Sequence, residues 1–174
     1  MSVCWHKLAA FVLLTSAISA QSAGAQASAD APVSAVIDIT RADLVAAPVA
    51  ANWPSYNGDY TGRRFTSLNQ ISPSNVDQLR GQWVFHAPKS DALEVTPVVV
   101  NGVMFITVAN DAFAVDARTG RTIWHYSRPI TEGLIDDASA HHNRGVGVWG
   151  TRVFMNTDVG TDLRLSWPKT TSFG

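Results

Sequence analysis

The side chains best suited to chemistry are Glu94 and a cluster formed by Arg144, His141 and His142. Arg144 belongs to an Asn-Arg-Gly run, and a guanidinium can grip a carboxylate with two parallel hydrogen bonds. Adjacent histidines can line a binding pocket or hold a metal ion. Each position also has a plainer interpretation, because loops carry exposed arginines and histidines and strand edges carry solvated carboxylates. The choice depends on the elements that position these residues.

The chain beyond residue 80 consists of short β-rich runs separated by turn residues. Between two of these runs, Asn101-Gly102 supplies the positive φ angles of a type I′ turn, which predicts a hairpin. Four short antiparallel strands in one unit are typical of a β-propeller blade. The expected strands are residues 97–100, 103–108, 112–116 and 122–126, and residues 82–86 form a further β-rich run.

The stretch from Ala114 to Trp124 has a physical reason at each of its marked positions. Asp116 can accept hydrogen bonds from the turn backbone, and Gly120 can take a positive φ angle after Thr119. Trp124 offers a large apolar surface that can pack against the Ala114 position of a neighbouring blade. The alternative is a single hairpin with a buried tryptophan. This interpretation is weaker, because several positions of the stretch fit the blade pattern at once.

The strand pattern begins to repeat. Residues 150–156 are similar in sequence pattern to residues 101–107, at an offset of 49 residues (150 − 101). Repeats of this length are typical of propeller blades and longer than ankyrin or leucine-rich repeats. Two hairpins of a β-sandwich could give the same echo by chance. The pattern favours an all-β fold, a β-propeller with about one full blade and part of a second.

The stretch from Ala114 to Trp124 resembles the tryptophan docking motif of the eight-bladed quinoprotein alcohol dehydrogenases, which depend on pyrroloquinoline quinone (PQQ). The resemblance runs from about residue 38 to about residue 156. It includes residues 52–58 and 64–71 of the leading segment, residues 94–104 of the first blade, and the Asn-Arg-Gly run before the second. It implies an incomplete propeller of the quinoprotein type.

The resemblance assigns PQQ contacts to Glu94 and Arg144. PQQ is a tricarboxylate, which suits a guanidinium, whereas a carboxylate facing this anion must be protonated or paired. The family's Ca²⁺ ligands and catalytic aspartate fall downstream of residue 174, so no catalytic or metal-ligating residue is assigned and we expect the chain to be inactive alone. In the full-length family, an alcohol or sugar-like hydroxyl is oxidised and electrons pass to a cytochrome or quinone.

The chain departs from the family shortly before the Asn-Arg-Gly run. Many members carry two adjacent cysteines there, which form a disulfide against the cofactor. This chain has residues 138–140, an Ala-Ser-Ala run, followed by His141 and His142. The histidines could line the cofactor pocket or bind a metal, or they could be polar loop residues. We therefore expect a divergent branch of the family.

A second departure lies in residues 158–174. The 49-residue offset predicts the turn and docking residues of a second motif, but the chain has Leu165, Pro168, Lys169 and Phe173 at those positions. We hypothesise that a frameshift or gene truncation replaced the native sequence after about residue 157. One blade and part of a second would expose strand edges and apolar faces, so we expect a marginally folded or aggregating chain.

The N-terminus has the features of a secretory signal peptide, residues 1–27. A short basic region precedes an apolar region, residues 8–18, that is too short to span a bilayer. Cleavage is expected after Ala25 or Ala27, which predicts a periplasmic mature chain without a membrane span. The only cysteine, Cys4, lies in the removed segment, so disulfides are not expected.

The remaining chain divides into a leader, residues 28–51, and an ordered domain, residues 52–157. Thr40 can cap a short helix in the leader. A two-turn helix is expected after Ser72, because a proline follows at the first helical position, and it should end near Arg80.

Composition restricts the function classes. The 174 residues are 46% hydrophobic and 16% charged, which is ordinary for a folded protein, and a formal charge of −1 argues against nucleic-acid binding. The first hypothesis is a PQQ-dependent oxidoreductase, favoured by Arg144 and Glu94. The alternative is a non-enzymatic PQQ-repeat propeller that binds periplasmic proteins, weakened because no lipid-anchor cysteine follows the apolar region. A fragment without function is the third.

Overall fold

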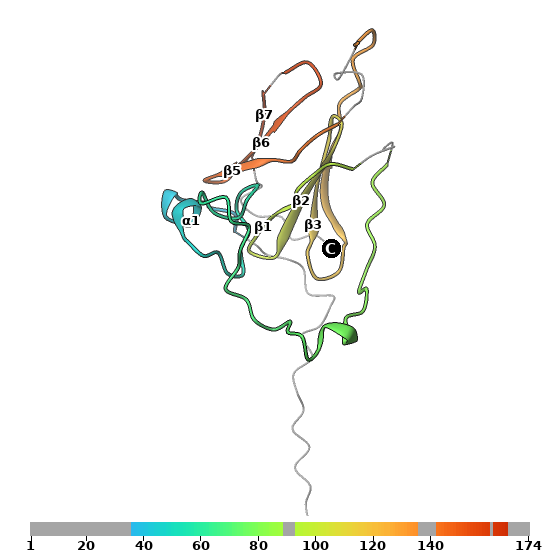
Figure 1. The fold of residues 1–174 in the computed structure, drawn as a ribbon. Helices are drawn as coiled ribbons and strands as arrows, with labels where there is room; N and C mark the ends of the chain where they lie inside the picture. Colours follow the sequence, from blue (N-terminus) through green and yellow to red (C-terminus); the bar gives the residue numbers. More distant parts are fainter. Residues whose placement is uncertain (1–35, 89–92, 136–141, 161, 167–174) are drawn as a thin grey trace, which may run out of the picture.

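The structure of the chain is a computed structural model that describes residues 36–88, 93–135, 142–160 and 162–166. The described strands form two antiparallel sheets, one with the order β1-β2-β3-β4 and one with the order β5-β6-β7 (Figure 1). The first sheet contains β1 Val98–Val100, β2 Val103–Val108, β3 Asp111–Asp116 and β4 Thr122–Tyr126. The second contains β5 Gly147–Trp149, β6 Arg152–Asn156 and β7 Asp162–Ser166. Two short helices precede them, α1 Arg41–Val45 and η1 Val76–Gln78.

The first sheet has the four strands that the sequence predicts. β1 and β2 pair with Val100 opposite Val103, so Asn101-Gly102 is a two-residue turn. The φ angles are 49° at Asn101 and 78° at Gly102, as a type I′ turn requires. β3 is buried along its whole length between β2 and β4. The predicted hairpin and strand order are therefore confirmed.

The turn between β3 and β4 is held by Asp116. The Gly120 N–H donates to the Asp116 carbonyl oxygen at 2.8 Å, and the Arg118 N–H donates to the Asp116 carboxylate at 2.9 Å. Burial alone would raise the pKa of Asp116, but hydrogen bonds and charge from Arg118 outweigh it and lower the pKa. The carboxylate stays ionised and holds the turn, in the role that the sequence predicts.

The second sheet repeats the first hairpin. β5 and β6 pair with Trp149 opposite Arg152, and β6 takes the place that β2 has in the first sheet, as the 49-residue offset predicts. β7 pairs with β6 along all five of its residues. Because β7 lies within residues 158–174, strand pairing continues where the side-chain motif has been lost. The frameshift concerns the coding DNA and stays a prediction.

One apolar core joins the two sheets and the N-terminal segment. Its buried side chains come from β1 to β3, from β5 and β6, and from the segment before α1; they are Ile37, Ile39, Val98, Val100, Val103, Phe105, Ala114, Val148 and Val153. Ile39 and Gly150 also exchange two backbone hydrogen bonds of 3.1 and 2.7 Å. Packed structure is therefore already present at residue 37, inside the segment expected to be a leader.

Trp124 lies against this shared core. It sits opposite Ala114 within the first sheet, and its ring centroid is 6.1 Å from that of Phe105. The ring is partly buried against a cluster to which the second sheet contributes Val148 and Val153. The expected contact was with the Ala114-like position of a neighbouring blade, residue 163, whose side chain lies outside the described part of the chain.

Residues 82–86 form no strand, contrary to their β-rich composition. They cover the other face of the first sheet, where the Phe85 ring meets Phe113 edge-on at 5.1 Å. Trp83 Nε1 donates to the Ala117 carbonyl oxygen at 3.2 Å. The rings fix this segment on the sheet face, so its backbone does not pair with a strand edge in the described structure.

The two helical predictions have opposite outcomes. Thr40 caps α1, and the Asp43 carboxylate accepts from the Thr40 hydroxyl at 2.6 Å and from the Thr40 N–H at 2.8 Å, which together lower the pKa of Asp43. The two-turn helix expected after Ser72 is wrong, because only the single turn η1 forms. The Asn75 side chain accepts from the Ser72 N–H at 2.8 Å and donates to the Gln70 carbonyl oxygen at 2.9 Å, but the Asn75 backbone, at φ −136° and ψ 0°, is not helical, so the capped turn at Ser72 does not continue as a helix.

Candidate cofactor-binding site

The two predicted site residues meet at the end of the first sheet where β1 begins. Glu94 Oε2 lies 3.1 Å from Arg144 Nη2. Glu94 precedes β1 and Arg144 precedes β5, so corresponding positions of the two sheets come together. The Arg144 side chain is 74% exposed and that of Glu94 35%. The guanidinium is therefore paired on one side and accessible to a ligand.

His142 is a second partner of the Glu94 carboxylate. Its Nδ1 lies 3.2 Å from Glu94 Oε1, so the two carboxylate oxygens have different partners. Among the described residues, no group of three or more His, Cys, Asp or Glu could hold a metal ion. His142 thus lies at the site beside a carboxylate, and His141 lies outside the described residues.

Asn143 anchors the loop that carries Arg144. Its Oδ1 accepts from the Thr107 hydroxyl at 2.7 Å and from the Gly145 N–H at 3.0 Å. Its Nδ2 donates to the carbonyl oxygens of Ala109 and Asn156, both at 2.9 Å. One amide therefore joins the first sheet to the end of β6 and fixes the backbone on either side of the arginine. The sequence marks Asn143 as part of a motif but does not reveal this role.

Gly145 lets the loop approach the start of β1. Its φ angle is 123°, which L side chains rarely adopt, and a Cβ there would lie 3.0 Å from the Thr96 carbonyl oxygen. A side chain at this position would push the loop away from residues 94–96. The glycine is therefore one reason why Arg144 reaches Glu94.

A tyrosine and a second arginine from the leading segment border this pair. Arg64 Cζ lies 4.8 Å from the centroid of the Tyr56 ring, and Arg64 Nε donates to Asn57 Oδ1 at 2.9 Å. The pKa of Tyr56 is lowered, first by its hydrogen bond with Arg64, then by that with Thr96, and also by the charges of Arg64 and Arg144. Sequence reasoning missed this placement, because no spacing rule connects residues 56 and 64 to residue 144.

The charges and donors of the site suit an anion. The charges of two guanidiniums, Arg64 and Arg144, both act on Tyr56, and Arg144 is paired with the carboxylate of Glu94. Guanidinium groups bind carboxylates in preference to neutral groups. Glu94 is paired, so it does not oppose a negatively charged ligand as an isolated carboxylate would. These residues fit a group that, like PQQ, carries several carboxylates.

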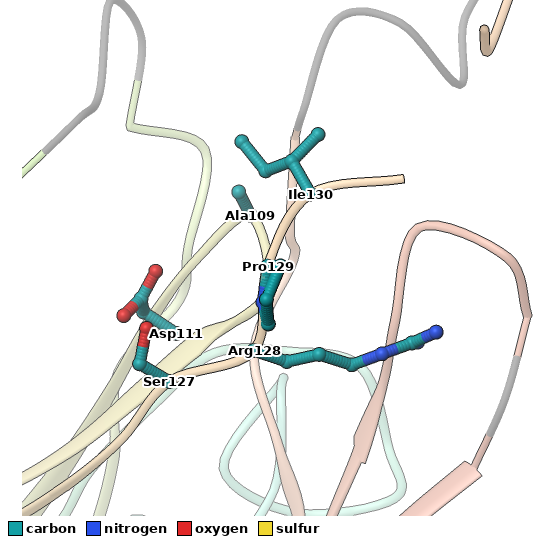
Figure 2. Close-up of a pocket in the computed structure, with 6 residues that line it drawn as sticks. All are labelled: Ala109, Asp111, Ser127, Arg128, Pro129 and Ile130. Carbon is teal, nitrogen blue, oxygen red and sulfur yellow. The ribbon is translucent and has the colours of Figure 1, made fainter. Parts of the chain in front are cut away.

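An open pocket of about 380 Å³ lies between the β2–β3 turn and the segment after β4 (Figure 2). Its lining residues are Ala109, Asp111, Ser127, Arg128, Pro129 and Ile130. In Figure 2 the Arg128 side chain points away from Asp111, and its Nη1 lies 3.8 Å from Asp158 Oδ1. Asp111 Oδ1 lies 2.7 Å from His125 Nε2. The two charged residues of this pocket therefore already have protein partners.

The family model for the PQQ glucose/ethanol/alcohol dehydrogenase β-propeller domain matches residues 53–162. This chain belongs to the PQQ-dependent alcohol dehydrogenase family. A quinohemoprotein alcohol dehydrogenase of Comamonas testosteroni is 31% identical over 161 residues, which are 88% of this chain and 22% of that protein. The solved structure of quinohemoprotein alcohol dehydrogenase ADHIIG from Pseudomonas putida HK5 has a TM-score of 0.61 and 29% identity, covering 82% of this chain and 22% of the other.

These relatives confirm the resemblance and the partial β-propeller that the sequence predicts. The Pseudomonas putida ADH-IIG sequence is 37% identical over 106 residues, which are 60% of this chain. The matched region spans 22% of the length of the Comamonas testosteroni protein and 15% of that of the Pseudomonas putida protein. No helix in the described ranges is long and apolar enough to cross a membrane.

Proposed function

We propose that this chain supplies the Glu94–Arg144 part of the cofactor site of a periplasmic PQQ-dependent dehydrogenase that oxidises an alcohol or sugar-like hydroxyl. The observation that supports it most is the 3.1 Å pair of Glu94 and Arg144, formed across two sheets of a quinoprotein propeller. A cytochrome or quinone is the proposed electron acceptor of the whole enzyme.

The residues of this chain bind and orient the cofactor. Arg144 donates N–H groups to a PQQ carboxylate, while Glu94 holds the other side of the guanidinium. The Asn143 amide keeps the loop in place, so the donors are positioned before the ligand arrives. Bound PQQ supplies the electron-accepting quinone of the reaction.

Turnover requires further groups in this proposal. As the resemblance implies, a calcium ion would supply a Lewis acid for the quinone, and an aspartate would supply the base for the alcohol. The resemblance implies that both groups lie downstream of the region that this chain matches. We therefore propose that the chain alone binds PQQ without oxidising alcohols.

Equilibrium dialysis of PQQ against the whole chain tests the binding site. Replacing Arg144 by glutamine should weaken binding about tenfold to a hundredfold, because a charge-assisted hydrogen bond is lost. The control is Arg121→Gln, which removes the same charge beside the β3–β4 turn, at the other end of the first sheet. Equal affinity of the Arg144→Gln variant and the unaltered chain would reject the proposed site.

The periplasmic location is tested separately. Expression with the natural N-terminus should give a mature chain that begins at Gln26 or Ser28, as measured by mass spectrometry of the periplasmic fraction. An unprocessed chain in the cytoplasm would contradict this part of the proposal and leave the PQQ site unaffected.

A further inference from the structure

Arg64 is a basic side chain at the site that the proposed PQQ contacts do not include. It is held in place by two contacts: Nε donates to Asn57 Oδ1 at 2.9 Å, and the guanidinium lies over the Tyr56 ring at 4.8 Å. Its φ angle of 53° lies in the left-handed region, so the backbone also has an uncommon, defined conformation. The guanidinium is therefore positioned before any ligand binds.

The positive charge of Arg64 is not offset by a carboxylate. Two other arginines each form an ion pair with a carboxylate: Arg63 lies 3.7 Å from Asp59, and Arg144 lies 3.1 Å from Glu94. Within the described residues, no ion pair of this kind involves Arg64, whose partners are the Asn57 amide and the Tyr56 ring. Arg64 thus provides the excess positive charge of the site.

Tyr56 connects the two arginines. The antiparallel pairing of Trp53 with Val99 brings the segment of Tyr56 alongside Thr96, and both Arg64 and Thr96 lower the pKa of the Tyr56 hydroxyl. Thr96 is the residue against which Gly145 is packed, immediately after Arg144. A continuous path of contacts therefore runs from Arg64 through Tyr56 and Thr96 to the loop that carries Arg144.

We propose that Arg64, oriented by Tyr56, is a second anion-binding residue of the same site, so that a ligand with several carboxylates contacts Arg64 with one and Arg144 with another. This inference rests on the proposed function, because the ligand class is that of the PQQ site. It explains why a rigid polycarboxylate would be preferred to a monocarboxylate. Each guanidinium binds one carboxylate, and only the polycarboxylate contacts both.

The test is the dissociation constant of PQQ measured by dialysis against the whole chain, which counts bound ligand whether the chain is monomeric or associated. Arg64→Gln should weaken PQQ binding about tenfold. The matched control is Arg63→Gln, which removes the same charge from the preceding residue, where Asp59 already neutralises it. The control should change the affinity less than about twofold.

Competition by two probes gives a readout that a purely structural role would not produce. Trimesate, an aromatic tricarboxylate, should displace PQQ from the unaltered chain more effectively than benzoate does. In Arg64→Gln this advantage should largely disappear, while it should persist in Arg63→Gln. If Arg64→Gln alters the far-UV circular dichroism, Tyr56→Phe replaces it, because it removes only the hydroxyl and should weaken PQQ binding about threefold.

The outcomes separate this inference from the proposed function. If Arg64→Gln leaves the PQQ affinity unchanged while Arg144→Gln weakens it, the proposed contact of Arg64 is overturned and that of Arg144 stands. Equal losses in Arg63→Gln and Arg64→Gln overturn it too, because they would reflect overall charge. If neither Arg64→Gln nor Arg144→Gln weakens binding, both proposals fail.

Discussion

The Thr107 hydroxyl donates to the Asn143 side-chain oxygen at 2.7 Å, and this bond connects an interior strand of the first sheet to the loop of the candidate site. The same asparagine donates to the carbonyl oxygens of Ala109 and Asn156. The position of Arg144 therefore depends on the packing of both sheets, so stability and ligand binding are linked at one side chain.

Replacing Asn143 by alanine should lower the free energy of unfolding by about 1–3 kcal/mol, because the Ala109 and Asn156 carbonyl groups lose their donor. It should also weaken PQQ binding, since the loop loses its anchor. Urea unfolding at one protein concentration and PQQ dialysis measure the two effects. Asn75→Ala, which removes a half-buried amide from the turn before η1, should leave PQQ binding unchanged. A destabilised Asn143→Ala variant with full PQQ affinity would show that the loop does not need this anchor.

Gly120→Ala should be more destabilising than Gly102→Ala. Both glycines have positive φ, 71° and 78°, so alanine meets the same backbone strain, about 1 kcal/mol, at each. Only at Gly120 would the new Cβ approach the Trp83 ring, at 2.6 Å; at Gly102 nothing lies within 4 Å. The difference between the two urea midpoints measures the displacement of Trp83. Equal midpoints would mean that the ring moves without cost.

Asp158 should make the chain more stable at neutral than at acid pH. Its pKa is lowered, mainly by the Thr131 N–H at 2.7 Å and with help from Asn110 and Arg128. A carboxyl whose folded pKa lies below its unfolded value, about 4, stabilises the fold above that pH and loses its contribution as pH falls through the folded pKa. The Asp158→Asn variant should therefore be less stable than the unaltered chain at pH 7, and it should lose less stability when the pH is lowered. Parallel urea midpoints of the two proteins from pH 7 to pH 3 would contradict this.

The chain should self-associate in solution. β4 is the end strand of its sheet, and the Val84 side chain on the segment that covers this sheet is 76% exposed. Sedimentation velocity of the unaltered chain should show species larger than a monomer. Val84→Lys should reduce that fraction, whereas Thr61→Lys, on a polar surface turn, should not. A monodisperse monomer with one sharp cooperative melt would reject the prediction.

Local turn chemistry made the first sheet predictable. Asn101-Gly102 and the Asp116 to Gly120 turn each have one favoured conformation, so strand positions followed from them. The Ser72 helix failed because the Asn75 backbone, at φ −136° and ψ 0°, leaves the helical conformation three residues after the cap. Resemblance placed Glu94 and Arg144 in one site, but periodicity alone could not have done so.

The remaining site residues depend on contacts distant in sequence. Tyr56 comes under the charge of Arg144 because the leading segment pairs with β1, where Trp53 and Val99 exchange backbone hydrogen bonds of 2.7 and 2.9 Å. Asn143 gains its role only when both sheets are present. Neither relationship leaves a pattern in a single sequence.

The pairing of Ile39 with Gly150 has a consequence for biosynthesis. Residue 39 is synthesised long before residue 150, so Ile39 lacks its backbone partner until the second hairpin has been made. Contacts of such high sequence separation close late and slow the folding reaction. A nascent chain stopped before residue 150 should therefore be the form most dependent on chaperones.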